Sequence, residues 1–327
     1  MTKSATREAA DKVTFTQAEV TSAITAGDTA ARAGRKNLII NGSAMVSQRG
    51  SYTSATTIQN ASYFLDRFRF QNSVVTGTVQ HTSISLNGVN KKAIKVAATS
   101  TGTGYLILQQ TVEFESIQVG ENYTVSCWVR SNNANTRFRQ NTFRATSEDG
   151  TAFTNDGNWE KVSWTFSSTG TTGSPTINIA MYNNANVSIS NGDYFEITEL
   201  QLETGSVATD FEHRSYGEEL RLCERYFYRY QGATQEQIYN ENANAGGKWW
   251  FLRFPEMRTT PSATFSSGWT GGSIVVIGGT INSMSVGGGS STAMSFRVHN
   301  SGTGGTVKSI YHTDSFSQDY CYLSAEL

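Results

Sequence analysis

The chain has 327 residues, of which 37% are hydrophobic, 11% aromatic and only 16% charged. Its formal net charge is −1, from 26 Lys and Arg against 27 Asp and Glu, so the excess of positive charge typical of proteins that bind nucleic acid or an anionic membrane surface is missing. The three cysteines, Cys127, Cys223 and Cys321, lie far apart in the sequence, which argues against a disulfide framework or a zinc site and predicts reduced, buried thiols.

Residues 1–36 form a polar segment rich in Ala and Thr. They lack the charged and then apolar pattern of a signal peptide, and no stretch of the chain approaches about 18 consecutive apolar residues, so neither secretion nor membrane insertion is expected. Thr16 to Glu19 match a capping box, and Asp28 is a candidate helix cap. Two short helices with so little apolar surface do not fold alone. Two interpretations remain: a disordered leader, or an anchor that becomes ordered against a partner or against copies of itself.

From Asn37 on, apolar and polar residues alternate with the period of two that is typical of strands. The apolar run 37–42 ends in an Asn-Gly turn signal. Further strands are expected at residues 67–71, 93–97, 105–112, 123–129, 160–166, 176–182 and 193–202. About eight strands, each with one buried face, predict two stacked antiparallel sheets.

Residues 214–227 break this alternation. Ser215 to Glu218 match a capping box, in which a hydroxyl and a carboxylate satisfy each other's backbone donors. An apolar stripe at helical spacing follows, made of Tyr216, Leu220, Cys223 and Phe227. We therefore expect a short amphipathic helix in this segment.

Strand patterns resume after the helix, at residues 226–231, 248–254, 273–277, 294–299, 307–311 and 320–325, separated by turns rich in Gly and Ser. Both faces of residues 248–254 carry large apolar side chains, so this strand is expected to be buried on both sides, inside a core or between subunits. The predicted fold class is all-β: a β-sandwich followed by a short helix and a second, smaller C-terminal β domain.

Several stretches resemble known families. The run from Leu200 to Glu212, followed by Arg225-Tyr226-Phe227, resembles the hinge of bacteriophage tail-fibre and virion appendage proteins. Residues 37–42, 158–166 and 195–202 resemble the jelly-roll carbohydrate-binding modules attached to many glycan-active proteins. Two further motifs match the phage family, Asp66-Arg67-Phe68 and the stretch from Met257 to Pro261. The resemblance to the jelly roll and hinge covers residues 37–227.

This resemblance implies three parts: a short helical N-terminal anchor at residues 1–36, a jelly-roll domain like a carbohydrate-binding module at 37–213, and a hinge helix with a C-terminal β tip at 214–327. It implies a structural protein of the virion without enzymatic activity, a tail fibre that assembles as a homotrimer. Residues 1–36 would attach it to the phage tail or to other virion proteins, and the β domains would bind a host cell-surface polysaccharide. The alternatives are a capsid decoration or head-fibre protein and a polysaccharide depolymerase.

Exposed aromatic side chains are the candidates for glycan binding, because the C–H faces of sugar rings stack on aromatic planes. In the predicted sandwich these are Tyr105, Trp128 and Tyr182, and near turns of the predicted tip they are Tyr239, Trp269, Tyr311 and His312. For each of the first three, a place in the core is the competing interpretation, because large aromatic residues dominate protein cores.

Metal and catalytic sites have weaker signals. Jelly-roll modules that bind sugars frequently hold a structural calcium near the opening Asn-Gly motif, and calcium requires oxygen ligands. This chain has Ser43 where an acidic residue often follows, and Glu196 is either a ligand or a solvated carboxylate. No metal or other cofactor is required by any motif. Glu203, Asp210 and Glu212 are close together in the sequence, and turn and cap roles are favoured over the carboxylate pair of a glycosidase.

Overall fold

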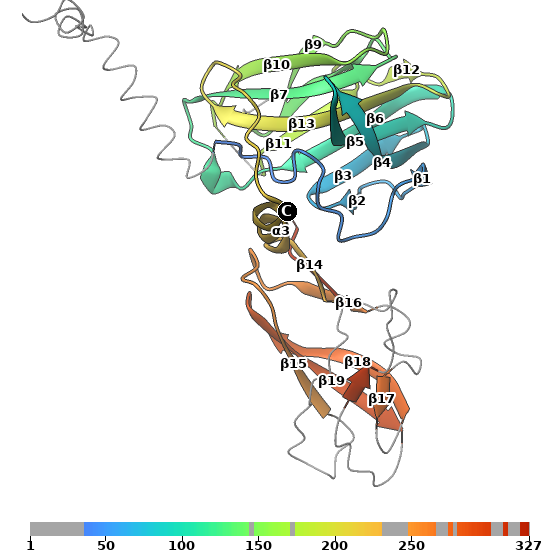
Figure 1. The fold of residues 1–327 in the computed structure, drawn as a ribbon, viewed down its shortest axis with the longest axis vertical. Helices are drawn as coiled ribbons and strands as arrows, with labels where there is room; N and C mark the ends of the chain where they lie inside the picture. Colours follow the sequence, from blue (N-terminus) through green and yellow to red (C-terminus); the bar gives the residue numbers. More distant parts are fainter. Residues whose placement is uncertain are drawn as a thin grey trace, which may run out of the picture.

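The computed structural model describes residues 36–143, 147–170, 174–230, 248–265, 274–276, 280–301, 310–312 and 321–326. The predicted anchor, apart from residue 36, lies outside these ranges, as do Tyr239 and Trp269. Two antiparallel sheets stack into a jelly-roll sandwich in the N-terminal part of the described chain (Figure 1), which confirms the predicted fold class. No helix among the described residues is long and apolar enough to cross a membrane.

The first sheet has six strands and the second has seven. In the first sheet the spatial order is β1 (Thr56–Thr57), β4 (Gly77–Leu86), β5 (Val89–Ala98), β13 (Tyr194–Thr204), β7 (Asn122–Ser131) and β10 (Glu160–Ser167). In the second sheet it is β2 (Ser62–Leu65), β3 (Phe68–Ser73), β6 (Gly102–Thr111), β11 (Thr176–Met181), β8 (Thr136–Asn141) and β9 (Glu148–Ala152), with β12 (Val187–Ile189) paired to β6. A 3₁₀ turn, η1 (Phe114–Ser116), follows β6.

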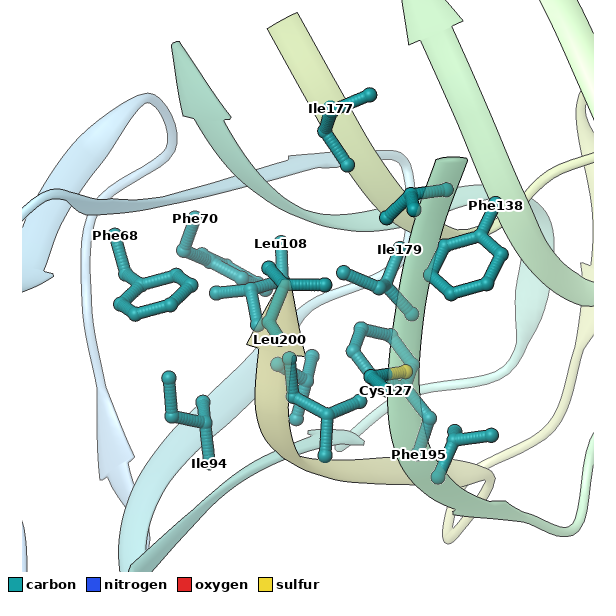
Figure 2. Close-up of a cluster of buried hydrophobic side chains, with 14 of the residues drawn as sticks. Phe68, Phe70, Ile94, Leu108, Cys127, Phe138, Ile177, Ile179, Phe195 and Leu200 are labelled. Atoms are coloured by element: carbon teal, nitrogen blue, oxygen red, sulfur yellow. The ribbon is translucent and has the colours of Figure 1, made fainter. Parts of the chain in front are cut away.

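The core lies between the two sheets and is built from alternate residues of each strand. Across the second sheet, Phe70, Leu108, Ile179 and Phe138 stand opposite one another on four adjacent strands, and all are at most 1% exposed (Figure 2). The alternate apolar residues of β7 and β11 do lie in the core, which contains Tyr123, Val125, Cys127, Val129, Ile177, Ile179 and Met181. The expectation of a single buried face is wrong for β11, because its other face is buried as well. Each such large side chain, when fully buried, contributes about 1.5–3 kcal/mol of hydrophobic free energy.

Residues 37–42 do not form the strand that their apolar pattern suggests. The segment runs beside β13 but pairs with it only through single bonds, from Leu38 N to Leu202 O and from Leu200 N to Gly42 O. It then turns sharply, with Asn41 at φ 63° and Ala44 at φ 56°. The pattern was misleading because hydrogen bonds from side chains, described below, replace the ladder that a strand would need.

Helix α3 (Tyr216–Glu224) begins with the predicted capping box, in which Ser215 and Glu218 bond reciprocally. Its buried face differs from the predicted stripe. The helix buries Glu219, Leu222 and Cys223, whereas Tyr216 is 56% exposed. The helical period was predicted correctly, but the buried side of the helix includes the carboxylate of Glu219 and leaves out Tyr216. Figure 1 shows α3 between the sandwich and the C-terminal strands.

The described residues of the C-terminal part form three small antiparallel sheets, so a β unit does follow the helix. The first has the order β14 (Phe227–Tyr230), β21 (Cys321–Ser324) and β16 (Ser262–Phe265), the second β15 (Lys248–Arg253), β19 (Ala293–Ser301) and β18 (Thr280–Gly289), and the third pairs β17 (Ile274–Val276) with β20 (Ile310–His312). The side chains of residues 248–252 are not among those described, so the burial of both faces of this strand stays a prediction.

Candidate functional site

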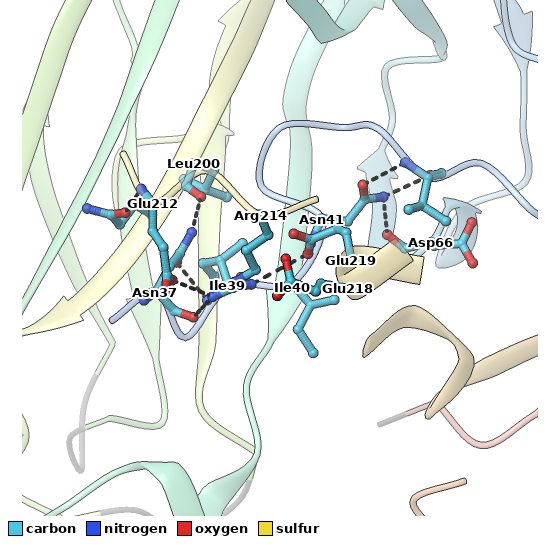
Figure 3. Close-up of polar contacts among 12 residues, drawn as sticks. Asn37, Ile39, Ile40, Asn41, Asp66, Leu200, Glu212, Arg214, Glu218 and Glu219 are labelled. Carbon is cyan, nitrogen blue, oxygen red and sulfur yellow. Dashed lines mark hydrogen bonds and ion pairs between the residues drawn. The ribbon is translucent and has the colours of Figure 1, made fainter. Parts of the chain in front are cut away.

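The hinge signature builds the junction between the sandwich and α3. Asn37 is buried, and its side chain bonds two backbone groups of β13: Nδ2 donates to Leu200 O at 3.2 Å, and Oδ1 accepts from Leu202 N at 3.1 Å (Figure 3). Its backbone N donates to the carboxylate of Glu212 at 2.8 Å. Burial raises the pKa of Glu212, but bonds from the Asn37 backbone and Arg214 outweigh burial and hold the pKa below its ordinary value.

Arg214 and Glu219 complete this junction. Arg214 donates to the carbonyls of Asn37 and Ile39 and pairs with the carboxylate of Glu212 at 2.7 Å. The carboxylate of Glu219, which is 4% exposed, accepts from Asn41 N and lies 3.5 Å from Arg214 (Figure 3). These charges satisfy backbone groups that would otherwise be buried without partners. The signature therefore encodes a structural clamp.

The carboxylate of Glu203 stabilises a turn, as predicted. Its oxygens accept from the backbone N of Thr209 at 2.8 Å and from the Thr209 hydroxyl at 2.7 Å. Asp210, by contrast, has a fully exposed carboxylate 3.7 Å from Lys161. The three acidic residues of this stretch are therefore not arranged as a pair around one cleft.

The Asp66-Arg67-Phe68 motif builds a buried ionic latch. Arg67 is 1% exposed and adopts φ 70°; its guanidinium lies 3.5 Å from the centre of the Tyr226 ring and bonds to the carboxylate of Glu326. Arg49 pairs with the same carboxylate at 2.5 Å and stacks on Phe227 at 3.8 Å. The latch thus joins the segment after β21 to the sandwich. A cavity of about 320 Å³ adjoins it.

Tyr105 and Tyr182 come together on the outer face of the second sheet. Their rings meet edge to face with centroids 6.1 Å apart, and the guanidinium of Arg139 lies 4.7 Å from the centre of the Tyr182 ring. Both rings are half-buried, so part of each aromatic surface stays open to a ligand. This pair fits the predicted sugar-stacking role better than any other candidate aromatic whose side chain is described.

A polar row crosses the same face beside the tyrosines. Strand register places Arg69, Gln109, Asn178, Arg139 and Asp149 opposite one another on five adjacent strands, one residue along from the core row. Asn178 donates to Arg139 O at 3.4 Å, but its buried Oδ1 accepts no hydrogen bond from the described residues. An unpaired buried acceptor costs about 1–3 kcal/mol, so this position favours a donor from water or from a ligand hydroxyl.

The remaining candidate residues do not join this face. Trp128 lies on the first sheet, opposite Thr198 and Lys161, and is half-buried. Tyr311 and His312 belong to β20, and their side chains are not among those described. Sequence reasoning missed Arg139 and Asn178. The alternation of Thr136 to Asn141 gave a signal for Arg139, since it is typical of a strand with arginines on one face.

The structure corrects the expectation for Glu196. Its carboxylate is neither solvated nor free for a metal, because it is 1% exposed, ion-paired with Arg130 at 2.6 Å and bonded to the Thr82 hydroxyl. Near the opening Asn-Gly turn, the side-chain oxygen of Asn41 accepts from Val46 N. These oxygens serve protein donors and do not fit a calcium site. Among the described residues there is no group of three or more His, Cys, Asp or Glu that could hold a metal ion.

A second cavity, of about 650 Å³, opens beside the β4–β5 hairpin. Glu199 lines it from a β-bulge of β13, with φ 54° and 8% exposure, and is ion-paired with Lys91. His213 lies 3.9 Å from the same carboxylate. The bulge lets Gly42 approach the Leu200 carbonyl, where a Cβ would lie only 2.0 Å from the oxygen.

No protein-family model matches the chain, and no curated protein matches it. Similar solved structures include the enzymatically active domain of bacteriophage CBA120 tailspike protein 4, at 14% identity and TM-score 0.35, over 52% of this chain and 21% of that one. TmCBM61 in complex with β-1,4-galactotriose matches at 14% identity and TM-score 0.32, over 52% of this chain and 100% of that one. A putative sugar binding protein from Bacteroides thetaiotaomicron matches at 13% identity and TM-score 0.31, with the same coverage. Likeness at this level assigns no ligand or activity to this chain.

Proposed function

We propose that this chain is a bacteriophage virion appendage of the tail-fibre type, and that its jelly roll binds a host surface glycan on the outer face of the second sheet. The observation that carries the proposal is the half-buried pair Tyr105 and Tyr182 beside a row of amide and guanidinium groups. Aromatic planes take the apolar faces of sugar rings, and amides and guanidinium groups bond to their hydroxyls.

The virion role rests on the hinge signature and has a further consequence for assembly. We propose that residues 1–36 attach the chain to the phage tail or to other virion proteins, and that three copies form the fibre. Three weak glycan contacts on one particle act together, so a modest affinity at each outer face is enough for adsorption. Light scattering after size-exclusion chromatography should report three times the mass of the chain, and a monomer at micromolar concentration would contradict the fibre.

Glycan binding is tested with purified protein and polysaccharide extracted from host cell surfaces. Tyr105→Ala and Tyr182→Ala should each weaken binding about tenfold, equivalent to roughly 1.4 kcal/mol. The matched control is Tyr216→Ala, because this tyrosine is 56% exposed on α3, away from the outer face of the second sheet. Unchanged binding in both outer-face variants would overturn the glycan role of this face.

The same experiments separate the alternatives. Release of reducing ends from the polysaccharide would identify a depolymerase instead of a binding protein. A protein that binds no host glycan, and whose antibody leaves adsorption of the phage intact, would be a capsid decoration or head-fibre protein.

A further inference from the structure

The outer face of the second sheet carries an unusual charge pattern. Its outward positions on β3, β6, β11, β8 and β9 include three arginines, Arg69, Arg137 and Arg139, and one carboxylate, Asp149. Asp149 is ion-paired with Arg139 and so neutralises one of the three. In a chain of net charge −1, this concentration of guanidinium groups around the tyrosine pair makes the face locally cationic.

Arg69 and Arg137 are the two unpaired cations. Neither forms an ion pair with a carboxylate among the described residues. Within the described part of the chain, the Arg69 side chain donates from Nε to the Ala61 carbonyl at 3.0 Å. Arg137 donates from Nε to Asn135 O at 3.3 Å and from Nη1 to the side chain of Asn183 at 2.9 Å. Because a guanidinium has five N–H donors, each of these side chains is held by one edge and presents further donors.

These bonds orient the arginines for a ligand. A guanidinium binds a carboxylate through two parallel N–H donors, with more strength and more directional specificity than it binds a neutral hydroxyl. Both side chains are half-buried, so solvent screens them less than it screens a free surface charge. An acidic group on a sugar that stacks on Tyr105 or Tyr182 would find these donors within the same face.

The spacing of the two arginines indicates a polymer. Arg69 on β3 and Arg137 on β8 are separated by three strand spacings across the sheet and by two residues along it, which is about 16 Å between their Cα atoms at standard sheet dimensions. Gln109 and Asn178 lie between the two edges of this face; both are buried, and the Oδ1 of Asn178 has no donor among the described residues. Acidic groups carried on a chain of several sugar units can reach both arginines, whereas one acidic monosaccharide cannot.

We propose that the glycan taken by this face is an acidic polysaccharide whose carboxylates, as in uronate residues, pair with Arg69 and Arg137. These two arginines are then specificity-determining residues, and the tyrosines supply affinity that does not depend on ligand charge. This inference rests on the glycan role proposed above for the same face.

The test compares a panel of uronate polysaccharides with the same polymers after chemical reduction of their carboxyl groups to primary alcohols. Titration calorimetry should show wild-type affinity for at least one acidic polymer that exceeds its affinity for the reduced form by about tenfold or more, as charged hydrogen bonds imply. Arg69→Gln and Arg137→Gln should each remove most of that preference without changing affinity for the reduced polymer. Arg137→Lys should keep part of the preference for the acidic polymer, because lysine retains the positive charge but lacks the two parallel N–H donors of a guanidinium.

Arg221→Gln is the control, because this arginine is exposed on α3. Equal thermal unfolding midpoints of all variants exclude a folding defect. If acidic and reduced polymers bind equally and both depend on Tyr105, the acidic preference is refuted while the glycan role stands. If the preference also survives in Arg69→Gln and Arg137→Gln, or extends equally to an unrelated sulfated polymer, the assignment to these two arginines is overturned. If no polymer binds in a manner that depends on Tyr105, the glycan role of the face itself fails.

Discussion

Replacing Glu326 by alanine tests the latch that joins the C-terminal segment to the sandwich. The carboxylate of Glu326 bridges Arg49 and Arg67, and its side chain is 8% exposed while those of Arg49 and Arg67 are 13% and 1% exposed. Without it, the contacts that remain to Arg67 among the described residues are the Thr111 carbonyl at 2.5 Å and the Tyr226 ring, with the charge of Glu113 nearby. A buried cation that loses its counter-charge destabilises a protein by about 3–5 kcal/mol.

We expect a loss at the lower end, about 3 kcal/mol, because Arg49 retains some contact with water and both arginines stay stacked on aromatic rings. For a domain of this size the unfolding midpoint should fall by roughly 6–12 °C. Differential scanning calorimetry measures the midpoint. Amide hydrogen exchange should quicken in β14 and β21, which pair with each other from Phe227 to Tyr230.

Asp210→Ala is the matched control, because the Asp210 carboxylate is fully exposed and lies 3.7 Å from Lys161. Exposed ion pairs of this kind contribute little to stability, so its midpoint should match the wild type. A Glu326→Ala protein that melts within 1 °C of the wild type, with unchanged exchange in β21, would refute the latch.

Two further predictions concern the junction. Gly42→Ala should destabilise the fold, because the added Cβ would lie 2.0 Å from the Leu200 carbonyl oxygen. Gly217→Ala should instead stabilise α3 by about 0.5–1 kcal/mol, because the added Cβ lies in the first turn of the helix and meets no atom within 4 Å. Thermal melts in which Gly42→Ala is the more stable of the two variants would contradict this account. Burial raises the pKa of Glu113, but bonds from Arg225 and Tyr226 outweigh it and hold the pKa below 4.5. The ionised carboxylate of Glu113 therefore stabilises the fold above pH 4.5, and this contribution is lost as pH falls through the folded pKa. In Glu113→Gln, the free energy of unfolding from urea titrations should depend less on pH on the acid side. An unchanged dependence on pH would exclude this role.

Most strands of the sandwich could be predicted from sequence, because one-sided burial imposes a period of two on the side chains. The segment 37–42 shows where this reasoning fails. Ile39 is buried, but the backbone of the segment is bonded by the side chains of Arg214 and Glu219 instead of a neighbouring strand. Bonds between residues more than 170 positions apart in sequence leave no local pattern.

The candidate site was predictable in part. Tyr105 and Tyr182 were identified as aromatic candidates, but their contact depends on the register of β6 against β11, which pairs Leu106 with Met181. A slip of one residue would exchange the core and outer faces. The same register sets the row that contains Asn178. Since many long-range contacts decide it, a single sequence yields the residue types of the site but not their arrangement.

Strand β6 connects the proposed glycan face to the junction. Near its start Tyr105 faces outward, and near its end Gln110 bonds the backbone of Ile40 at 2.8 Å in both directions. The carbonyl of Thr111, the last residue of β6, accepts from Arg67 in the latch. A binding face gains affinity when its groups are held in place before the ligand arrives. The latch and the clamp at residues 37–41 therefore do more than attach the helix, because they also restrain the strand that carries Tyr105.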